Sequence, residues 1–245
     1  MNDIKNKVVL IVGLGMIGGS IARGLKKANP KRRIIACDTD AQALQQAVDD
    51  GVVSQSGELA ALCPQADIII LAVPPLTVCE LLLEVLKHMA SNAIITDVAS
   101  VKSHIFTSSQ QFSEKALAKF VPAHPIAGSE QSGYSAAIDD LFEQRNVILT
   151  PHAGNSPDSV ATINSLWREL GANVLGMTRV RHDEVLAATS HLPHLLAYAI
   201  VDVLLKQEQS EDIFRYAAGG FADFSRLASS DAKMWSDIFV ANSAA

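Results

Sequence analysis

The sequence predicts an α/β protein, in which a doubly wound, mostly parallel sheet is followed by a smaller, all-helical domain. Short runs rich in β-branched residues alternate with stretches of helical periodicity over most of the chain. Runs such as Ile68-Ile69-Ile70-Leu71 are apolar on both faces, as strands covered by helices on both sides must be. The alternation stops near Thr178, and every later segment has helical periodicity.

The expected elements follow in chain order from these runs. Strands are expected at residues 7–12, 33–38, 67–73, 93–96, 119–122, 146–150 and 173–176. Helices are expected between them at 16–28, 40–50, 77–89 and 156–170, and after them at 182–206, 210–217 and 221–239. Gly219-Gly220 is expected to separate the last two helices. The domains are therefore predicted at residues 1–178 and 179–245.

Composition and charge narrow the class of protein. Hydrophobic residues make up 49% of the 245 residues and charged residues 19%, which favours a folded globular chain of one domain plus a smaller one. The net charge is −6, and the longest basic run is Lys31-Arg32-Arg33. Neither nucleic acid nor an anionic membrane surface is therefore an expected partner.

Cysteine usage and hydropathy indicate a cytoplasmic protein. Cys37, Cys63 and Cys79 are too few and too far apart for a disulfide framework or a metal site, so we expect reduced, mostly buried thiols. The first strand begins by Lys7, which leaves no room for a signal peptide. No apolar run reaches the roughly 18 residues of a membrane span. The most apolar late stretch, 195–205, contains Asp202 and is expected to be a buried helix.

A glycine-rich loop predicts dinucleotide binding. Gly13-Leu14-Gly15-Met16-Ile17-Gly18 has the form G-x-G-x-x-G and lies directly between an expected strand and an expected helix. In such a loop one glycine makes the tight turn, the next lets the backbone approach a pyrophosphate, and the third lets helix pack on strand. The phosphates then face the helix N-terminus. The alternative is an ordinary turn.

Two further features support a Rossmann-type domain that binds NAD. Asp38 lies 20 residues after Gly18, at the end of the second strand, where a carboxylate hydrogen-bonds the adenine ribose and repels the extra phosphate of NADP. Its alternative role is to cap the next helix. Ala72-Val73-Pro74-Pro75 follows the strand at 67–73, at the edge where ligands of open α/β sheets bind, although a plain strand-to-helix turn accounts for it equally well.

Dehydrogenation of an alcohol needs a proton acceptor, and a neutral histidine suits this role near pH 7. Four histidines, His88, His104, His152 and His182, are expected on helix surfaces or in loops, exposed to solvent. His124 follows an expected strand in Ala123-His124-Pro125-Ile126-Ala127-Gly128-Ser129-Glu130, where a side chain can reach a nicotinamide. Spacing alone leaves a structural loop histidine as its alternative.

The helical domain offers further polar candidates. His191 and His194 share one helical face, but no third ligand is evident, so no metal site is expected. Arg226 lies among apolar residues on an expected helix. It is either paired with Asp223, three residues earlier, or available to bind an anion.

With these residues in place, the chain resembles the prephenate and arogenate dehydrogenases of tyrosine biosynthesis over nearly its whole length. The matching segments are residues 13–20, Asp97-Val-Ala-Ser-Val-Lys102, His124-Pro-Ile-Ala-Gly-Ser-Glu130, Ser190-His-Leu-Pro-His194, Gly219-Gly-Phe-Ala-Asp-Phe-Ser-Arg226 and Met234-Trp235. The first is shared by many dehydrogenases, whereas the others, in this order, are too specific for chance agreement.

The resemblance implies NAD-dependent oxidative decarboxylation of prephenate to 4-hydroxyphenylpyruvate, or of arogenate to tyrosine. It assigns His124 as the acceptor of the ring hydroxyl proton and Ser100 as the residue that positions that hydroxyl and histidine. It assigns Arg226 to a substrate carboxylate and His194 to the substrate pocket. Ser129 and Glu130 match residues that line the pocket entrance.

The resemblance also implies a homodimer formed through the C-terminal helices. Family members usually continue through further helices after the segment that matches Met234-Trp235, so we expect a shorter helical domain here. Neither a regulatory nor a fused mutase domain is expected. Two other functions stay open: a catalytically inactive NAD-sensing module, and a β-hydroxy acid dehydrogenase. The latter would need a catalytic lysine, which the helix from His182 lacks before Lys206.

Overall fold

A five-stranded parallel sheet forms the centre of the N-terminal domain. The computed structural model describes residues 4–109, 112–128, 131–207, 210–216 and 218–245. The sheet has the order β3-β2-β1-β4-β5. Its strands are β1 (Val9–Val12), β2 (Ile34–Cys37), β3 (Gln55–Ser56), β4 (Ile68–Leu71) and β5 (Ile94–Asp97). The predicted doubly wound α/β class is confirmed.

A smaller sheet extends this domain. Its strands are β6 (Ala123–Pro125), β7 (Asn146–Leu149) and β8 (Asn173–Gly176), with β6 antiparallel to β7 and β7 parallel to β8. A parallel bridge from Ile95 to Phe120 joins the chain before β6 to β5. His124 therefore lies at the same edge of the domain as the carboxyl end of β5.

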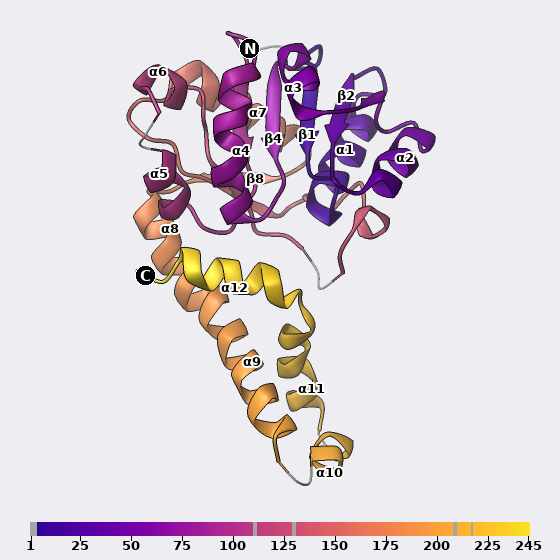
Figure 1. The fold of residues 1–245 in the computed structure, drawn as a ribbon, viewed down its shortest axis with the longest axis vertical. Coiled ribbons are helices and arrows are strands. Elements are labelled where there is room, and N and C mark those ends of the chain that lie inside the picture. The colour runs from indigo at the N-terminus through magenta and orange to yellow at the C-terminus, as the bar shows by residue number, and fades with distance from the viewer. Residues whose placement is uncertain (1–3, 110–111, 129–130, 208–209, 217) are drawn as a thin grey trace.

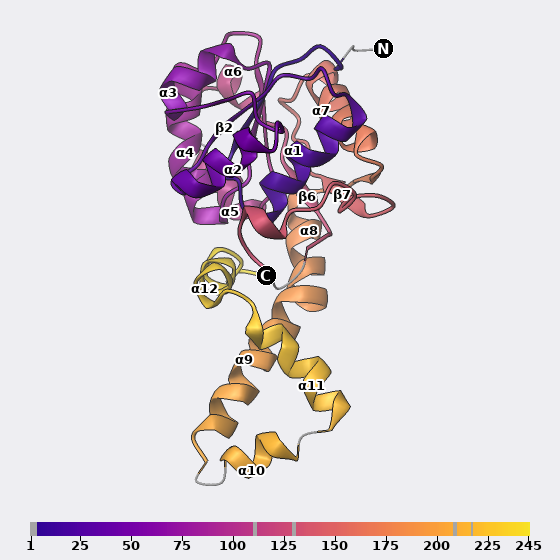
Figure 2. The same cartoon turned by 90° about the vertical axis from the view of Figure 1, so that its right-hand side faces the viewer.

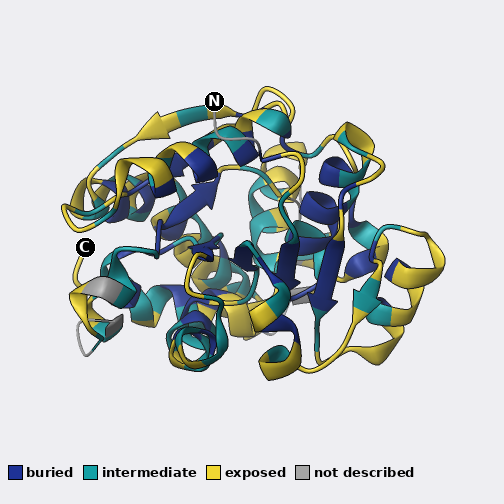
Figure 3. Ribbon diagram, turned by 90° about the horizontal axis from the view of Figure 1, so that it is seen from above, coloured by how far each residue is buried: buried dark blue, intermediate teal, exposed yellow. Residues whose placement is uncertain are grey.

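Helices cover both faces of the main sheet, and successive residues of each strand point to opposite sides (Figure 1). Val9 and Ile11 lie on the face of the sheet that is covered by α1 (Met16–Ala28), α2 (Ala41–Asp49) and α7 (Pro157–Glu169). Leu10 and Val12 lie on the opposite face, which is covered by α3 (Leu59–Leu62), α4 (Pro75–His88) and α5 (Ser103–Ser109). Strands β1, β2, β4 and β5 are consequently buried between the two helical layers, whereas the edge strand β3 is not (Figure 3). A further short helix, α6 (Glu114–Leu117), precedes β6.

The remaining residues form a helical arm that projects away from the sheet (Figures 1 and 2). A continuous helix runs from α8 (Arg179–Leu186) through a π-helical segment (Ala187–His191) into α9 (Leu192–Leu205). The chain returns through α10 (Ser210–Arg215), α11 (Gly219–Ser225) and a 3₁₀ turn (Arg226–Ser229) to α12 (Ala232–Ala241). Helix α12 contacts α4, so the arm folds back onto the N-terminal domain.

Some expected elements were wrong. The strand expected at 119–122 is instead at Ala123–Pro125, and the helix expected at 221–239 is interrupted. The interruption arises because Asp231 caps α12, accepting a hydrogen bond from the backbone N of Met234 at 2.7 Å. Gly219 and Gly220 open α11 rather than separating two helices, and residue 217 lies outside the described residues.

Helix α9 is not the buried helix that the sequence predicted. Only Ala197 is buried along α9. Its exposed apolar side chains are Leu192, Leu195, Leu196, Ile200, Val203 and Leu205, which are 40% to 60% exposed. The continuous helix Arg179–Leu205 is also long and apolar enough to cross a membrane by length and composition, contrary to the expectation from the sequence. Proteins rarely leave an apolar surface of this kind exposed to water unless a partner binds it.

Candidate active site

The predicted nucleotide loop connects β1 to α1 at the carboxyl edge of the sheet. Gly13 has a φ of 95°, a conformation that favours glycine, and its Cβ would lie 2.4 Å from the Ala72 carbonyl oxygen. A Cβ on Gly18 would lie 1.9 Å from the Gly13 carbonyl oxygen, so only glycine lets α1 pack this closely. A Cβ on Gly15 would contact nothing within 4 Å. The loop thus leaves open space in front of the α1 N-terminus, where Met16 and Ile17 lie.

Other predicted cofactor residues surround this loop. Asp38 accepts a hydrogen bond from the backbone N of Leu14 through Oδ2 and one from the backbone N of Asp40, at 2.8 Å, through Oδ1. It is Asp40, rather than Asp38, that caps α2. Ala72 and Val73 both approach Gly13, and Pro74 is the exposed residue before α4.

These residues fit NAD. An open loop at a helix N-terminus suits a pyrophosphate. The Asp38 carboxylate, which is half-buried and fixed by backbone donors, retains lone pairs for ribose hydroxyls.

His124 belongs to a buried chain of hydrogen bonds. Its Nδ1 lies 2.8 Å from Nε2 of His182, and Nδ1 of His182 lies 2.7 Å from Oδ1 of Asp183. His182 and Asp183 are 0% and 2% exposed, and His124 is 9% exposed. The expectation that His182 is solvent-exposed was therefore wrong. Helix α8 inserts its first turn against the N-terminal domain and buries this ring.

Asp183 also fixes the start of α5. Its two carboxylate oxygens accept hydrogen bonds from the backbone N atoms of Lys102, at 2.9 Å, and of Ser103, at 2.7 Å. A carboxylate at this position satisfies amides that the helix itself leaves unpaired. The same contacts join the helical arm to the loop after β5.

A buried ion pair ties that loop to β6. Lys102 Nζ donates to Oδ2 of Asp97, and Oδ1 of Asp97 accepts from the backbone N of Ala123 at 3.1 Å. Because Ala123 precedes His124, the position of His124 depends on the Asp97 carboxylate. Burial lowers the pKa of Lys102 below its ordinary value, although the attraction of Asp97 opposes this shift.

The environment of His124 favours its neutral form. Burial lowers the pKa of His124 well below 6.5, and repulsion from His182, Lys102 and His191 acts in the same direction. The loop that follows His124 also reaches the nucleotide loop: a Cβ placed on Gly128 would lie 3.5 Å from Met16 Cε. A buried histidine whose environment favours its neutral form thus lies on a segment that borders the nucleotide loop.

His191 and His194 have separate environments. His191 is buried, and its Nδ1 lies 2.9 Å from Nδ2 of Asn242. Burial lowers the pKa of His191 to about 4, although Asp183 opposes this shift. His194 stacks on Trp235 with ring centroids 3.6 Å apart. No group of three or more His, Cys, Asp or Glu side chains suited to a metal ion occurs in the described part of the chain.

The remaining predicted residues lie in the loop after β5, on the helical arm or outside the described residues. Ser100 is half-buried in the loop between β5 and α5. Arg226 opens the 3₁₀ turn between α11 and α12 on the helical arm, and its side chain is exposed. Ser129 and Glu130 lie outside the described residues.

Sequence reasoning missed His182, Asp183 and Lys102. An adjacent histidine and aspartate at the start of a helix was the available signal, since such a pair can hold an imidazole in one orientation. Fifty-eight residues separate His124 from His182, so only the fold shows that the two rings meet.

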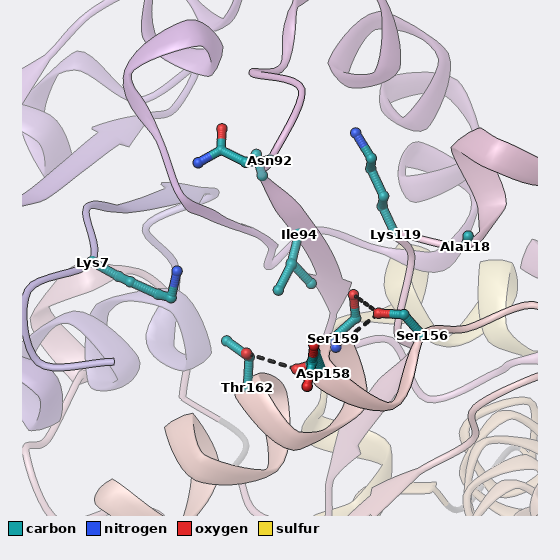
Figure 4. A pocket seen from close by; sticks show the side chains of 10 residues that line it. Lys7, Asn92, Ile94, Ala118, Lys119, Ser156, Asp158, Ser159 and Thr162 are labelled. Carbon is teal, nitrogen blue, oxygen red and sulfur yellow. Dashed lines mark hydrogen bonds between the residues drawn. The ribbon is translucent and has the colours of Figure 1, made fainter. Parts of the chain in front are cut away.

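A cavity of about 520 Å³ lies at the opposite edge of the sheet (Figure 4). Its lining includes Lys7, which precedes β1, Ile94, which begins β5, and Ser156, which caps α7. These residues mark the amino ends of the strands, away from the nucleotide loop. The cavity is therefore separate from the candidate active site.

Two family models match the chain. The nucleotide-binding domain of prephenate dehydrogenase matches residues 21–176, and the dimerization domain of prephenate dehydrogenase matches residues 179–245.

Curated relatives have similar sequences. A cyclohexadienyl dehydrogenase of Zymomonas mobilis is 33% identical over 98% of this chain and 82% of its own length. A prephenate dehydrogenase of Bacillus subtilis is 35% identical over 99% of this chain. The match spans 66% of that relative's length, so about a third of it has no counterpart here.

Solved structures have the same fold. The crystal structure of prephenate dehydrogenase from Aquifex aeolicus, in complex with hydroxyphenyl propionate and NAD⁺, superposes with a TM-score of 0.91 at 34% identity. The match covers 99% of this chain and 85% of that one. Synechocystis arogenate dehydrogenase gives a TM-score of 0.78 at 28% identity, covering 97% of this chain and 84% of its own.

Proposed function

This chain belongs to the prephenate dehydrogenase family, and from that premise we propose that it catalyses the NAD-dependent oxidative decarboxylation of prephenate to 4-hydroxyphenylpyruvate. The observation that carries the proposal is the position of His124. It is a buried histidine whose pKa is lowered by burial, in a loop that continues to within contact of Met16 at the nucleotide loop.

The residues divide the reaction among them. His124 takes the proton of the ring hydroxyl on Nε2, because Nδ1 is bonded to His182. NAD, held by the loop from Gly13 to Gly18 and by Asp38, would supply the acceptor for the hydride that leaves the carbinol carbon. The bond from the ring to its carboxylate then breaks with release of CO₂, and its electron pair makes the ring aromatic. The product oxygen recovers the proton from His124, which regenerates the neutral base.

Other residues hold the substrate. Arg226 binds a carboxylate, because a dianionic substrate needs a guanidinium that can form paired hydrogen bonds. Ser100, in the loop after β5, positions the reacting hydroxyl and His124. His194 contributes to the pocket from α9.

One assay tests the reaction and the choice of substrate. NADH formation is followed with prephenate and, separately, with arogenate, each with and without tyrosine. We expect turnover of prephenate; arogenate oxidation to tyrosine is the second candidate, because a relative of the same fold is an arogenate dehydrogenase. NAD binding without turnover of either compound would instead indicate a non-catalytic NAD-sensing module.

Asp38 should set the preference for NAD over NADP. Loss of its charge removes hydrogen bonds to the ribose and repulsion of the extra phosphate, so Asp38→Ser should narrow the preference by about tenfold or more. The measurement is kcat/KM for each cofactor. Asp40→Ser is the matched control, because it removes a nearby charge but keeps a helix-capping residue. If the wild-type enzyme had the same kcat/KM with NADP as with NAD, that result would contradict the role of Asp38.

The exposed apolar face of α9 should form a symmetric homodimer. Leu196→Glu places a charge in that face, and the cost of burying it should weaken the dimer by at least about tenfold. Light scattering at micromolar concentration measures the effect. Leu83→Glu is the control, because Leu83 on α4 is similarly exposed, at 43% against 47% for Leu196. A monomeric wild-type protein would refute this assembly.

A further inference from the structure

The buried chain that runs from His124 through His182 to Asp183 has a direction. Asp183 lies within hydrogen-bond distance of one ring nitrogen of His182, and the other ring nitrogen of His182 faces His124. The direction in which each hydrogen bond is donated decides where the proton on His124 lies. It therefore decides which nitrogen of His124 can act as a base.

Asp183 fixes this direction because it accepts hydrogen bonds in its ionised form. Burial acts to raise the pKa of Asp183, but hydrogen bonds from His182, Ser103 and Lys102 outweigh it and hold the pKa below its ordinary value. An ionised carboxylate can only accept, so Nδ1 of His182 must carry a proton. In a neutral His182 ring, Nε2 then has a lone pair and accepts from Nδ1 of His124.

We propose that His182 and Asp183 are positioning residues that hold His124 in the tautomer with its proton on Nδ1 and a lone pair on Nε2. The inference rests on the proposed function in one respect, namely that the lone pair on Nε2 receives the substrate proton. After that transfer His124 carries a positive charge. The hydrogen bonds from His124 Nδ1 to His182, and from His182 to the Asp183 carboxylate, stabilise this charge. The carboxylate of a Ser-His-Asp triad orients its histidine in the same way, but here a second imidazole, that of His182, lies between the carboxylate and the base.

The groups around His124 support this assignment. His182 and Asp183 approach from α8, Asp97 from the end of β5, Lys102 from the loop that follows it, and His191 from the π-helical segment. Lys102 donates to Asp97, on the β5 side. Within the part of the chain that the structure describes, His182 is the residue that contacts Nδ1 of His124.

The first test reads the tautomer directly. Nitrogen-15 NMR of the wild-type protein with bound NAD distinguishes protonated from unprotonated ring nitrogens, and the His124→Asn spectrum assigns the His124 signals. We expect a protonated Nδ1 and an unprotonated Nε2 on His124. The opposite pattern would overturn the proposal, whether or not the protein turns over prephenate. A wild-type protein with the expected tautomer but no activity would instead refute the proposed function alone.

The second test uses a pair of substitutions at His182. His182→Leu removes both hydrogen bonds and should lower kcat about ten- to hundredfold. His182→Gln should recover most of that loss, because its amide can donate to Asp183 and accept from Nδ1 of His124. The Leu variant should also lose the fixed tautomer in its NMR spectrum, which a merely structural defect would not cause. His88→Leu, which removes a partly exposed histidine at the end of α4, should leave kcat within about twofold.

Two outcomes of the second test would overturn the proposal. One is equal kcat for the Leu and Gln variants, with thermal unfolding confirming that both are folded. The other is an unchanged His124 spectrum in the Leu variant. Because the wild-type NMR measurement needs no substitution at His182, the proposal stays testable even if one variant fails to fold.

Discussion

His124→Asn is expected to lower kcat by roughly 10²- to 10⁴-fold, the usual contribution of a positioned acid or base. Asparagine keeps a polar side chain of similar reach but cannot accept the hydroxyl proton. Substrate binding should change less, because the proton moves only as the hydride leaves. Steady-state kinetics with saturating NAD separates the two effects.

The pH dependence provides a second readout of the same base. Burial of His124, with repulsion from His182, Lys102 and His191, lowers its pKa well below 6.5. A base works in its unprotonated form, so kcat/KM should stay high as pH falls through 6.5 and decline only at lower pH. An acid limb at or above pH 6.5 that His124→Asn abolishes would contradict the lowered pKa.

A matched control excludes a general effect of losing an imidazole. His88→Asn removes a partly exposed ring from α4, where the side chain pairs with Glu84, and should leave kcat nearly unchanged. Near-normal kcat in His124→Asn would show that another group takes the proton. That result would leave the assignment of the N-terminal domain to NAD binding unchanged.

Strands β1, β2, β4 and β5 of the main sheet could be predicted because their signal is local. A run such as Ile68-Ile69-Ile70-Leu71 has to be covered on both faces, and the structure covers it. The strand before His124 was placed about four residues too early, because residues 119–122 are as apolar as β6 and only pairing with β7 selects β6. The two-residue strand β3 and the four-residue helix α3 are too short for a periodic signal.

The cofactor loop was predictable for the same reason, whereas the histidine chain was not. Gly13, Gly15 and Gly18 lie within six positions and act through backbone geometry, which their spacing specifies. His182 acts through a contact with His124 that the packing of α8 creates. A histidine next to an aspartate in a helix has the same sequence pattern whether it is exposed or buried.

The apolar face of α9 marks another limit of sequence reasoning. Periodicity and composition indicate that residues such as Leu196 and Val203 avoid water, but they do not say what covers them. Burial within the chain was the expectation, and the structure leaves this face exposed. A face covered by a second copy has the same sequence pattern as one covered within the chain.

Arg226→Ala should chiefly raise KM, by about 10- to 150-fold, which corresponds to the loss of roughly 1.5 to 3 kcal/mol for a charged hydrogen bond. A guanidinium that holds a carboxylate does so in both the ground state and the transition state, so kcat should change little. Arg226→Lys should restore binding only in part, because an ammonium cannot copy the planar, two-pronged contact. The measurement is the same steady-state assay with NAD saturating.

Arg215→Ala is the matched control for Arg226→Ala. Arg215 is an exposed arginine on the same helical arm, at the end of α10, so its loss removes an equal charge without touching the proposed anchor. If both variants raised KM equally, long-range attraction of an anionic substrate by the arm would account for the effect, and it would weaken with salt. If Arg226→Ala left KM unchanged, the carboxylate would be bound elsewhere. A rise in KM confined to Arg226 would mean that a residue on the arm reaches substrate held at His124, so the arm would help to build the active site.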